Sequence, residues 1–178
     1  GFILIAPSPS ATNVAKTLGS AANLRINEWM ANPATGEDWF EIYNSDVNPV
    51  ALAGLYLSDS ISDLKITKIP ALSFAAGKGY TKFTADGTTD GGNHCNFKLA
   101  SGGEAIVLTN TNGTSQLNSV SFGAQTQGVS QGRLPDGAGS FAQFPQSTSP
   151  GASNYLPAPI VIQEALTNST APLEDAIE

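Results

Sequence analysis

Apolar and polar residues alternate along most of the chain, and glycine, asparagine, aspartate and proline interrupt the alternation at short intervals. A period of two is typical of strands that bury one face. No window of about 12 residues has a helical period. Many short strands at this spacing predict an all-β fold, an antiparallel β-sandwich with less than about 10% helix. The predicted strands are 24–30, 38–44, 54–58, 64–69, 79–84, 95–99, 104–109, 116–122, 129–134 and 141–144.

One turn can be predicted from its dipeptide. Asn112-Gly113 lies between the strands expected at 104–109 and 116–122. Asparagine followed by glycine accepts a positive φ at both central positions of a two-residue turn, which is the strongest short signal for a hairpin. We therefore expect these two strands to be neighbours in one sheet.

The opening of the central region recurs at the C-terminal end of the chain. Such self-similarity is typical of tandem arrays. A shorter match relates residues 2–13 to residues 141–154. We expect 1–22 to be the tail of a preceding repeat plus a linker, 23–154 one complete domain, and 155–178 a linker with the opening strands of a following repeat. The recurring residues are Ile26, Glu28, Asn32, Glu37, Asp38 and Glu41, which return as Ile162, Glu164, Asn168, Glu174, Asp175 and Glu178.

Two apolar, β-branched segments near the ends, 2–5 and 160–162, are predicted to be strands. Isolated strands are not ordered in water. They could pair with each other, with a free edge of the central domain, or across a molecular contact. We favour packing against the central sandwich or a neighbouring chain.

Composition and charge narrow the function. Hydrophobic residues make up 40% of the 178 residues, which is enough for a core. Charged residues make up only 13%, so serine, threonine, asparagine, glutamine and glycine must cover the surface, as is typical of secreted and cell-surface β-proteins. The net charge is −7 and the eight cations are scattered, which argues against nucleic-acid binding. No segment approaches the ~20 apolar residues of a membrane span.

A series of short motifs resembles the lamin-tail domain, most closely its bacterial form, over roughly residues 23–154. The resemblance implies an immunoglobulin-like β-sandwich that carries no associated catalytic residues. It also implies a surface or secreted accessory module, of the kind found beside hydrolases or adhesive domains. The motifs, in order, are Ile26-Asn-Glu28, Asn32-Pro33, Trp39 to Asn44, Leu52 to Asp59, Phe97-Lys-Leu99 with Gly103 to Leu108, Gly132 to Gly137, and Ser149 to Asn154.

Glu28 and Glu41 are the strongest candidates for a special role. On regular strands Glu28 shares a face with Ile26, and Glu41 shares one with Trp39. A buried carboxylate is costly unless it is paired or hydrogen-bonded. Arg133 can bind a carboxylate through two hydrogen bonds, so we expect it to pair with Glu28 or Glu41. We interpret the three as structural, in an ion pair or in loop capping, because no nucleophile accompanies the carboxylates.

Metal ligands are poorly represented. The loop that begins at Asp86 starts like a calcium-binding loop, but its twelfth position is Phe97, where an acidic ligand is needed. This leaves calcium at 86–93 open. His94 and Cys95 supply two ligands, whereas a structural zinc site takes four, so we expect Cys95 to be a packed small residue. A further acidic group that could gather at one loop end comprises Glu37, Asp38, Asp59 and Asp63.

These observations predict no enzyme activity and no cofactor. The leading hypothesis is a structural or protein-interaction module of a modular bacterial surface or secreted protein, whose partners are neighbouring repeats or another surface protein. The alternative is a carbohydrate-binding accessory module of an extracellular hydrolase, which requires at least two coplanar exposed aromatic rings. Aromatic residues in sandwiches more often pack in the core or at its rim. The candidates for a glycan platform are Trp29, Trp39, Tyr43, Tyr56, Tyr80 and Tyr155.

Overall fold

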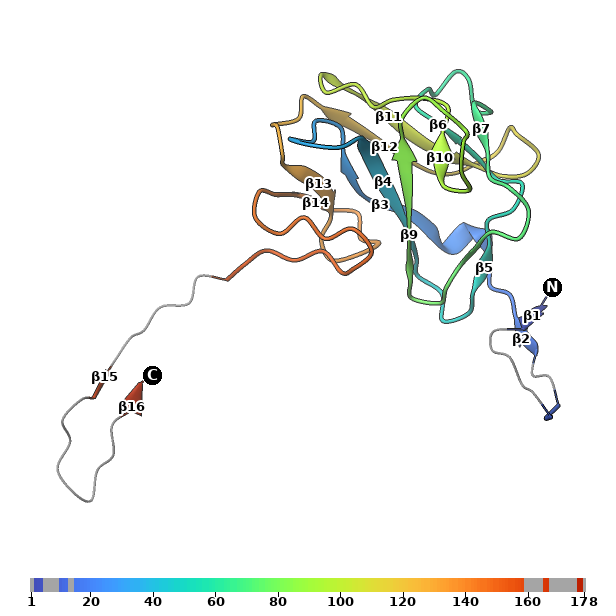
Figure 1. The fold of residues 1–178 in the computed structure, drawn as a ribbon, viewed down its shortest axis with the longest axis horizontal. Helices are drawn as coiled ribbons and strands as arrows, with labels where there is room; N and C mark the ends of the chain where they lie inside the picture. The colour runs from blue at the N-terminus through green and yellow to red at the C-terminus, as the bar shows by residue number, and fades with distance from the viewer. Residues whose placement is uncertain (1, 5–9, 13–14, 159–164, 167–175, 178) are drawn as a thin grey trace.

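The computed structural model describes residues 2–4, 10–12, 15–158, 165–166 and 176–177. The regular secondary structure of this part is almost entirely strand, with one 3-10 turn, η1, at Ala21–Asn23, and turns and loops make up the rest. Two main sheets face each other around an apolar core (Figure 1). The predicted all-β sandwich is confirmed.

The larger sheet has six strands and the smaller has four. Neighbouring strands are antiparallel in both sheets, except that β10 runs parallel to β9. The larger sheet has the order β10 (His94–Cys95), β9 (Tyr80–Ala85), β4 (Asp38–Asn44), β3 (Leu24–Met30), β13 (Ser130–Arg133) and β14 (Phe141–Phe144). The smaller has the order β12 (Gln116–Gly123), β11 (Gly103–Thr109), β6 (Tyr56–Ser58) and β7 (Thr67–Lys68).

Three further strand pairs lie outside the two main sheets. Two-residue strands are too short to show an alternation of apolar and polar residues, so the pairing of β5 with β8 was not predicted. Close to the N-terminus, Phe2–Leu4 pairs with a strand only about ten residues further along, and not with the central sandwich, which was one of the two partners we favoured. The strand predicted at 160–162 lies outside the described residues. The pairs are β5 (Val50–Ala51) with β8 (Phe74–Ala75), β1 (Phe2–Leu4) with β2 (Ala15–Thr17), and β15 (Ala165–Leu166) with β16 (Ala176–Ile177).

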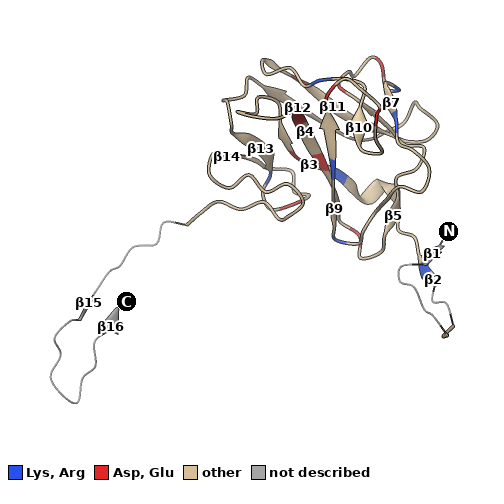
Figure 2. Cartoon of the chain, in the orientation of Figure 1, with Lys and Arg blue, Asp and Glu red and all other residues tan. Residues whose placement is uncertain are grey.

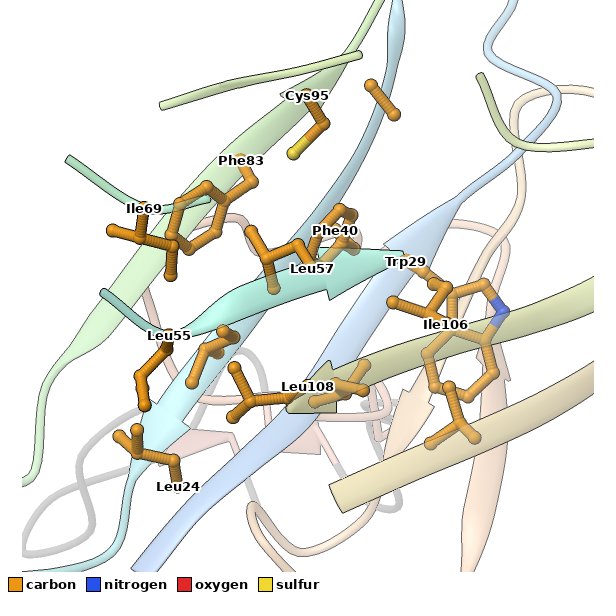
Figure 3. Close-up of a cluster of buried hydrophobic side chains, with 14 of the residues drawn as sticks. Leu24, Trp29, Phe40, Leu55, Leu57, Ile69, Phe83, Cys95, Ile106 and Leu108 are labelled. Atoms are coloured by element: carbon orange, nitrogen blue, oxygen red, sulfur yellow. The ribbon is translucent and has the colours of Figure 1, made fainter. Parts of the chain in front are cut away.

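The core lies between the two main sheets. Phe40 and Phe83 project from the larger sheet and stack with ring centroids 5.6 Å apart. They belong to one buried cluster with Leu57, Ile106 and Leu108 of the smaller sheet (Figure 3). Full burial of each such side chain contributes about 1.5–3 kcal/mol relative to exposure, so this cluster is the main source of stability.

The predicted hairpin of β11 and β12 is confirmed, but its turn is longer than expected. Asn110 N–H donates to the Ser115 carbonyl at 2.9 Å, and Gly113 N–H donates to the Asn110 carbonyl at 2.8 Å. Of Asn112 and Gly113, only Gly113 has a positive φ, at 71°. The loop therefore spans 110–115, and a positive φ occurs at one of these two positions rather than at both.

A β-bulge in β3 decides which side chains reach the core. Ile26 pairs with Ile42, but the next pair is Glu28 with Glu41, so Asn27 is an extra residue in β3. A bulge reverses the faces on which the following residues lie. As a result Glu28 lies on the outer face of the sheet, and our expectation that it shares a face with Ile26 is wrong.

Charged residues are sparse over the described chain, and acidic positions occur on the central strands β3 and β4 of the larger sheet (Figure 2). Within the described ranges no helix is long and apolar enough to cross a membrane. The acidic positions on β3 and β4 stand out because a sheet centre is normally apolar or covered.

Candidate functional site

The outer face of the larger sheet carries two buried glutamates on neighbouring strands. Glu28 of β3 and Glu41 of β4 lie directly opposite each other, and both are 0% exposed. The stretch 145–154, which follows β14 and is here named the closing segment, supplies hydrogen-bond donors to both (orange in Figure 1). The site is therefore a polar layer between the sheet and this segment.

Glu28 binds the closing segment and β13 through hydrogen bonds that it accepts. Ser130 Oγ donates to Glu28 Oε1 at 2.5 Å, and Ser149 N–H donates to both carboxylate oxygens at 3.3 Å. Ser149 Oγ donates to Oε2, also at 3.3 Å. Burial raises the pKa of Glu28, although these hydrogen bonds act in the opposite direction.

Glu41 binds the closing segment two residues further along the chain than Glu28 does. Gly151 N–H donates to Glu41 Oε2 at 2.8 Å, and Asn27 Nδ2 donates to Oε1 at 3.1 Å. Burial raises the pKa of Glu41 to about 7, against the effect of both hydrogen bonds, and the neighbouring Glu28 adds to the rise. Glu41 is thus an acid whose ionisation falls in the neutral range.

Asn27 uses its position in the bulge to connect Glu41 with the turn after β13. Its Nδ2 donates to Asp136 Oδ1 at 2.9 Å as well as to Glu41. Its Oδ1 accepts from Gly137 N–H at 2.9 Å. Both donor hydrogens and the acceptor of this buried amide are used, so the sheet and the turn are held in one register.

Asp136 is the third carboxyl group of the cluster. It accepts hydrogen bonds from Tyr80 OH at 2.7 Å, from Asn154 N–H at 3.1 Å and from Asn27. Partial burial alone would raise the pKa of Asp136, but the hydrogen bonds from Asn27, Tyr80 and Asn154 outweigh it and hold this pKa below its usual value. Asp136 is therefore ionised when the other two carboxyls are not.

Asn154 ends the closing segment and fixes it to two strands. Its Nδ2 donates to the carbonyls of Asn27 at 3.3 Å and Arg133 at 2.9 Å. Its Oδ1 lies 3.0 Å from Ser149 Oγ, whose single hydrogen is shared between Asn154 and Glu28. Because these groups are buried, each bond also removes the cost of an unpaired polar atom.

Arg133 is placed near the cluster but binds main-chain carbonyls. Its Nε donates to Ile26 O at 2.7 Å, and its Nη1 donates to Ala138 O. Its guanidinium carbon lies 4.9 Å from the centroid of the Phe141 ring. The guanidinium therefore joins β3 to the turn after β13 and covers an aromatic ring.

The prediction that Arg133 forms an ion pair with Glu28 or Glu41 is wrong. Within the described residues Arg133 forms no salt bridge with Glu28 or Glu41. β13 pairs with β3 only at Trp29 and Glu28, which leaves the Ile26 carbonyl without a strand partner and available to Arg133. The two glutamates instead accept their hydrogen bonds from the closing segment, which is the loop-capping role.

Replacing Arg133 with methionine is expected to lower the free energy of unfolding by about 1–3 kcal/mol, because two carbonyls lose their donor. Urea melts measure the loss. In a double-mutant cycle with Glu28→Gln, we expect a coupling energy below about 0.5 kcal/mol. A coupling above about 1.5 kcal/mol would show that Arg133 and Glu28 do interact as an ion pair.

The other candidate ligands have partners within the protein. His94 Nδ1 lies 2.5 Å from Asp86 Oδ2, and Asp86 Oδ1 accepts from Thr88 N–H. Asp38 Oδ2 accepts from Leu99 N–H at 3.0 Å. Across the described ranges no three His, Cys, Asp or Glu residues are close enough together to hold a metal ion. The structure therefore does not bring Glu37, Asp38, Asp59 and Asp63 into one site.

Cys95 lies in the core, as predicted, with 0% of its surface exposed. Burial raises the pKa of its thiol to about 12, so the thiolate that reacts with disulfide reagents is scarce. We expect 5,5′-dithiobis(2-nitrobenzoic acid) to leave Cys95 unlabelled in the folded chain at about pH 8 and to label it rapidly in urea. Rapid labelling without urea would contradict this burial.

The aromatic candidates do not form a platform. Trp29 and Trp39 are buried, and Tyr155 is the exposed one of the six. Tyr43 and Tyr80 stack with centroids 5.0 Å apart, but both rings are partly buried. No pocket was found over the described part of the chain.

Several residues of the cluster were missed by sequence reasoning. Asn27, Asp136, Asn154, Ser130 and Ser149 hold the two glutamates and each other. A signal existed, because four of them lie within the short motifs that resemble the lamin-tail domain. What the motifs did not show was that they meet in space.

Comparison with known families gives one match. Residues 18–124, more than half of the chain, match the Lamin Tail Domain. No curated protein matched the chain. The family is an immunoglobulin-like structural domain that is not known for catalysis. With its two-sheet sandwich and this match, the chain belongs to the lamin tail domain family.

Proposed function

We propose that this domain is a non-catalytic spacer or protein-interaction module of a modular bacterial protein that is secreted or displayed at the cell surface. The observation that carries the proposal is that the carboxyl groups of the outer face are occupied by hydrogen bonds within the protein. The oxygens of Glu28, Glu41 and Asp136 accept hydrogen bonds from the protein's own backbone and side chains. Groups that elsewhere perform acid–base chemistry hold the fold together here.

Sequence features support the modular and extracellular part of the proposal. The residues of β3 and β4 recur near the C-terminus, which favours neighbouring repeats as partners. The charged fraction of 13% is low, and polar uncharged residues cover much of the surface. Both features fit a module that spaces or presents other domains.

Native gels that contain soluble polysaccharides separate this function from the alternative. We expect the purified chain to migrate at the same rate with and without xylan, mixed-linkage glucan or mannan, and to release no reducing sugar from them. A retardation that grows with polysaccharide concentration would favour the carbohydrate-binding module. Serum albumin run in the same gels controls for sieving.

The proposed location has its own test. Proteinase K added to intact cells that produce the parent protein is expected to degrade this domain while a cytoplasmic marker survives. Degradation only after the cells are lysed would contradict surface display, and the culture medium must then be examined for the secreted form.

A further inference from the structure

Three carboxyl groups share one hydrogen-bond network without a paired cation. Asn27 connects Glu41 to Asp136, and the closing segment connects Glu41 to Glu28. In the described residues the salt bridges are His94–Asp86 and Lys98–Glu37, neither of which reaches the cluster. A buried carboxylate without a counter-charge is costly when ionised.

A lysine on the same outer face of the sheet forms no salt bridge with the cluster in the described residues. Lys82 of β9 lies opposite Glu41, but its Nζ is 5.2 Å from the centre of the Trp39 ring. On β4 and β9, Tyr43 and Tyr80 add two phenols, and the Tyr80 hydroxyl donates to Asp136.

The arginines are also engaged elsewhere. On β13, Arg133 donates to the Ile26 and Ala138 carbonyls, and on β3, Arg25 donates to two carbonyls at the start of that strand. The closing segment itself contains no titratable side chain. A change of charge in this layer must therefore come from the carboxyl groups.

The geometry favours a proton over a metal ion as the missing positive charge. Glu28 and Glu41 accept hydrogen bonds from backbone N–H groups of the closing segment, which repel a cation. The two residues are direct cross-strand partners, and side chains in that position have Cβ atoms about 4.5–5.5 Å apart. Two like charges at such a distance raise the affinity of one of them for a proton.

We propose that the Glu28–Glu41 pair is a proton-binding site, and that the bound proton determines how firmly the closing segment is held on the sheet. With one proton present, a single negative charge lies beneath the segment and is stabilised by its N–H groups. When that proton leaves, two carboxylates face each other in a buried layer, and the segment opens more often so that water reaches them. This inference is independent of the proposed spacer function.

The sign of the pH dependence follows from the direction of the shifts. Burial raises the pKa of Glu41 from 4.5 to about 7, and it raises the pKa of Glu28 as well. The closed state therefore binds the proton more tightly than the open state. Closure is strongest below the open-state pKa of 4.5, weakens as the pH rises towards 7, and is nearly constant above it.

The unmodified chain supplies the primary test. Side-chain carboxyl ¹³C shifts report the ionisation of each glutamate, and amide hydrogen exchange at Ser149 and Gly151, corrected for intrinsic rates, reports closure. We expect one carboxyl of the pair to titrate near neutral pH. Over about pH 5 to 8 the protection of both amides should fall roughly 30- to 100-fold.

Two variants assign the effect. Glu41→Gln should remove the pH dependence of protection, while Glu37→Gln, at an exposed surface position, should keep the wild-type fall. The proposal is overturned if both glutamates titrate below about pH 5, or if the protection stays constant while one of them ionises. If Glu41→Gln does not fold, the carboxyl titration and exchange of the unmodified chain still decide between these outcomes.

Discussion

Ending the chain after residue 124, where the family match stops, is expected to abolish cooperative folding. The cut removes β13, β14 and the closing segment. The cut takes away Phe144, which is 0% exposed, and Glu28 and Glu41 lose the N–H donors of the closing segment. β3 also loses its strand partner β13, so the edge of β3 and the outer face around the two glutamates become exposed to water. Together these losses are comparable to the typical stability of a domain, about 5–15 kcal/mol.

Circular dichroism and urea melts measure this effect. The matched control ends after residue 158, which keeps both strands and the closing segment, and its melting temperature should lie within about 3 °C of that of the full chain. A 1–124 chain that unfolds cooperatively near the midpoint of the full chain would show that the matched region is complete by itself.

Gly132→Ala is expected to have the second-largest effect, a loss of about 2–4 kcal/mol in the free energy of unfolding. A Cβ atom at position 132 would lie 2.5 Å from the Asn27 carbonyl oxygen, 2.8 Å from Asn154 Nδ2 and 3.0 Å from Glu28 Cα. Two of these atoms are backbone, so they cannot move aside without shifting β3. The crowding arises where β13 meets the bulge of β3 and where Asn154 of the closing segment binds carbonyls of both strands.

Gly123→Ala is the control for this prediction, because it makes the same exchange at a strand position where no atom lies within 4 Å of the added Cβ. We expect it to change the free energy of unfolding by less than about 0.5 kcal/mol in urea melts. Equal losses in the two variants would mean that the crowding around Gly132 does not determine the effect.

Much of the sandwich could be predicted because its longer strands carry a clear alternation. The predicted limits of 24–30, 38–44 and 141–144 coincide with those of β3, β4 and β14. The short strands β5 and β8, and the parallel pairing of β10 with β9, were not predicted. Two-residue strands have no period of their own, and the direction of pairing depends on the path of the chain between them.

The bulge at Asn27 explains why the candidate site was predicted only in part. A constant period of two places Glu28 on the same face of the sheet as Ile26. The extra residue in β3 instead moves Trp29 to the core and Glu28 to the outer face. The side-chain pattern contains no separate signal for such an insertion. The identity of Glu28 and Glu41 as special residues was therefore predictable, but the face was not.

The partners of the glutamates could not be predicted because they are distant in sequence. Glu28 and Ser149 are 121 positions apart, and Asn27 and Asp136 are 109 apart. Charge complementarity suggested Arg133 as the partner. The structure gives preference instead to backbone N–H groups of the closing segment, since they also need acceptors when buried.

Hydrogen exchange of the intact chain at about pH 5.5 tests most directly the claim that the buried glutamates hold the closing segment as part of the fold. We predict that the amides of Ser149 and Gly151 exchange as slowly as the amides of the central strand β4, because both require an opening close to global unfolding. If both amides exchange as fast as those of an unstructured peptide while β4 remains protected, Glu28 and Glu41 do not hold the closing segment in solution.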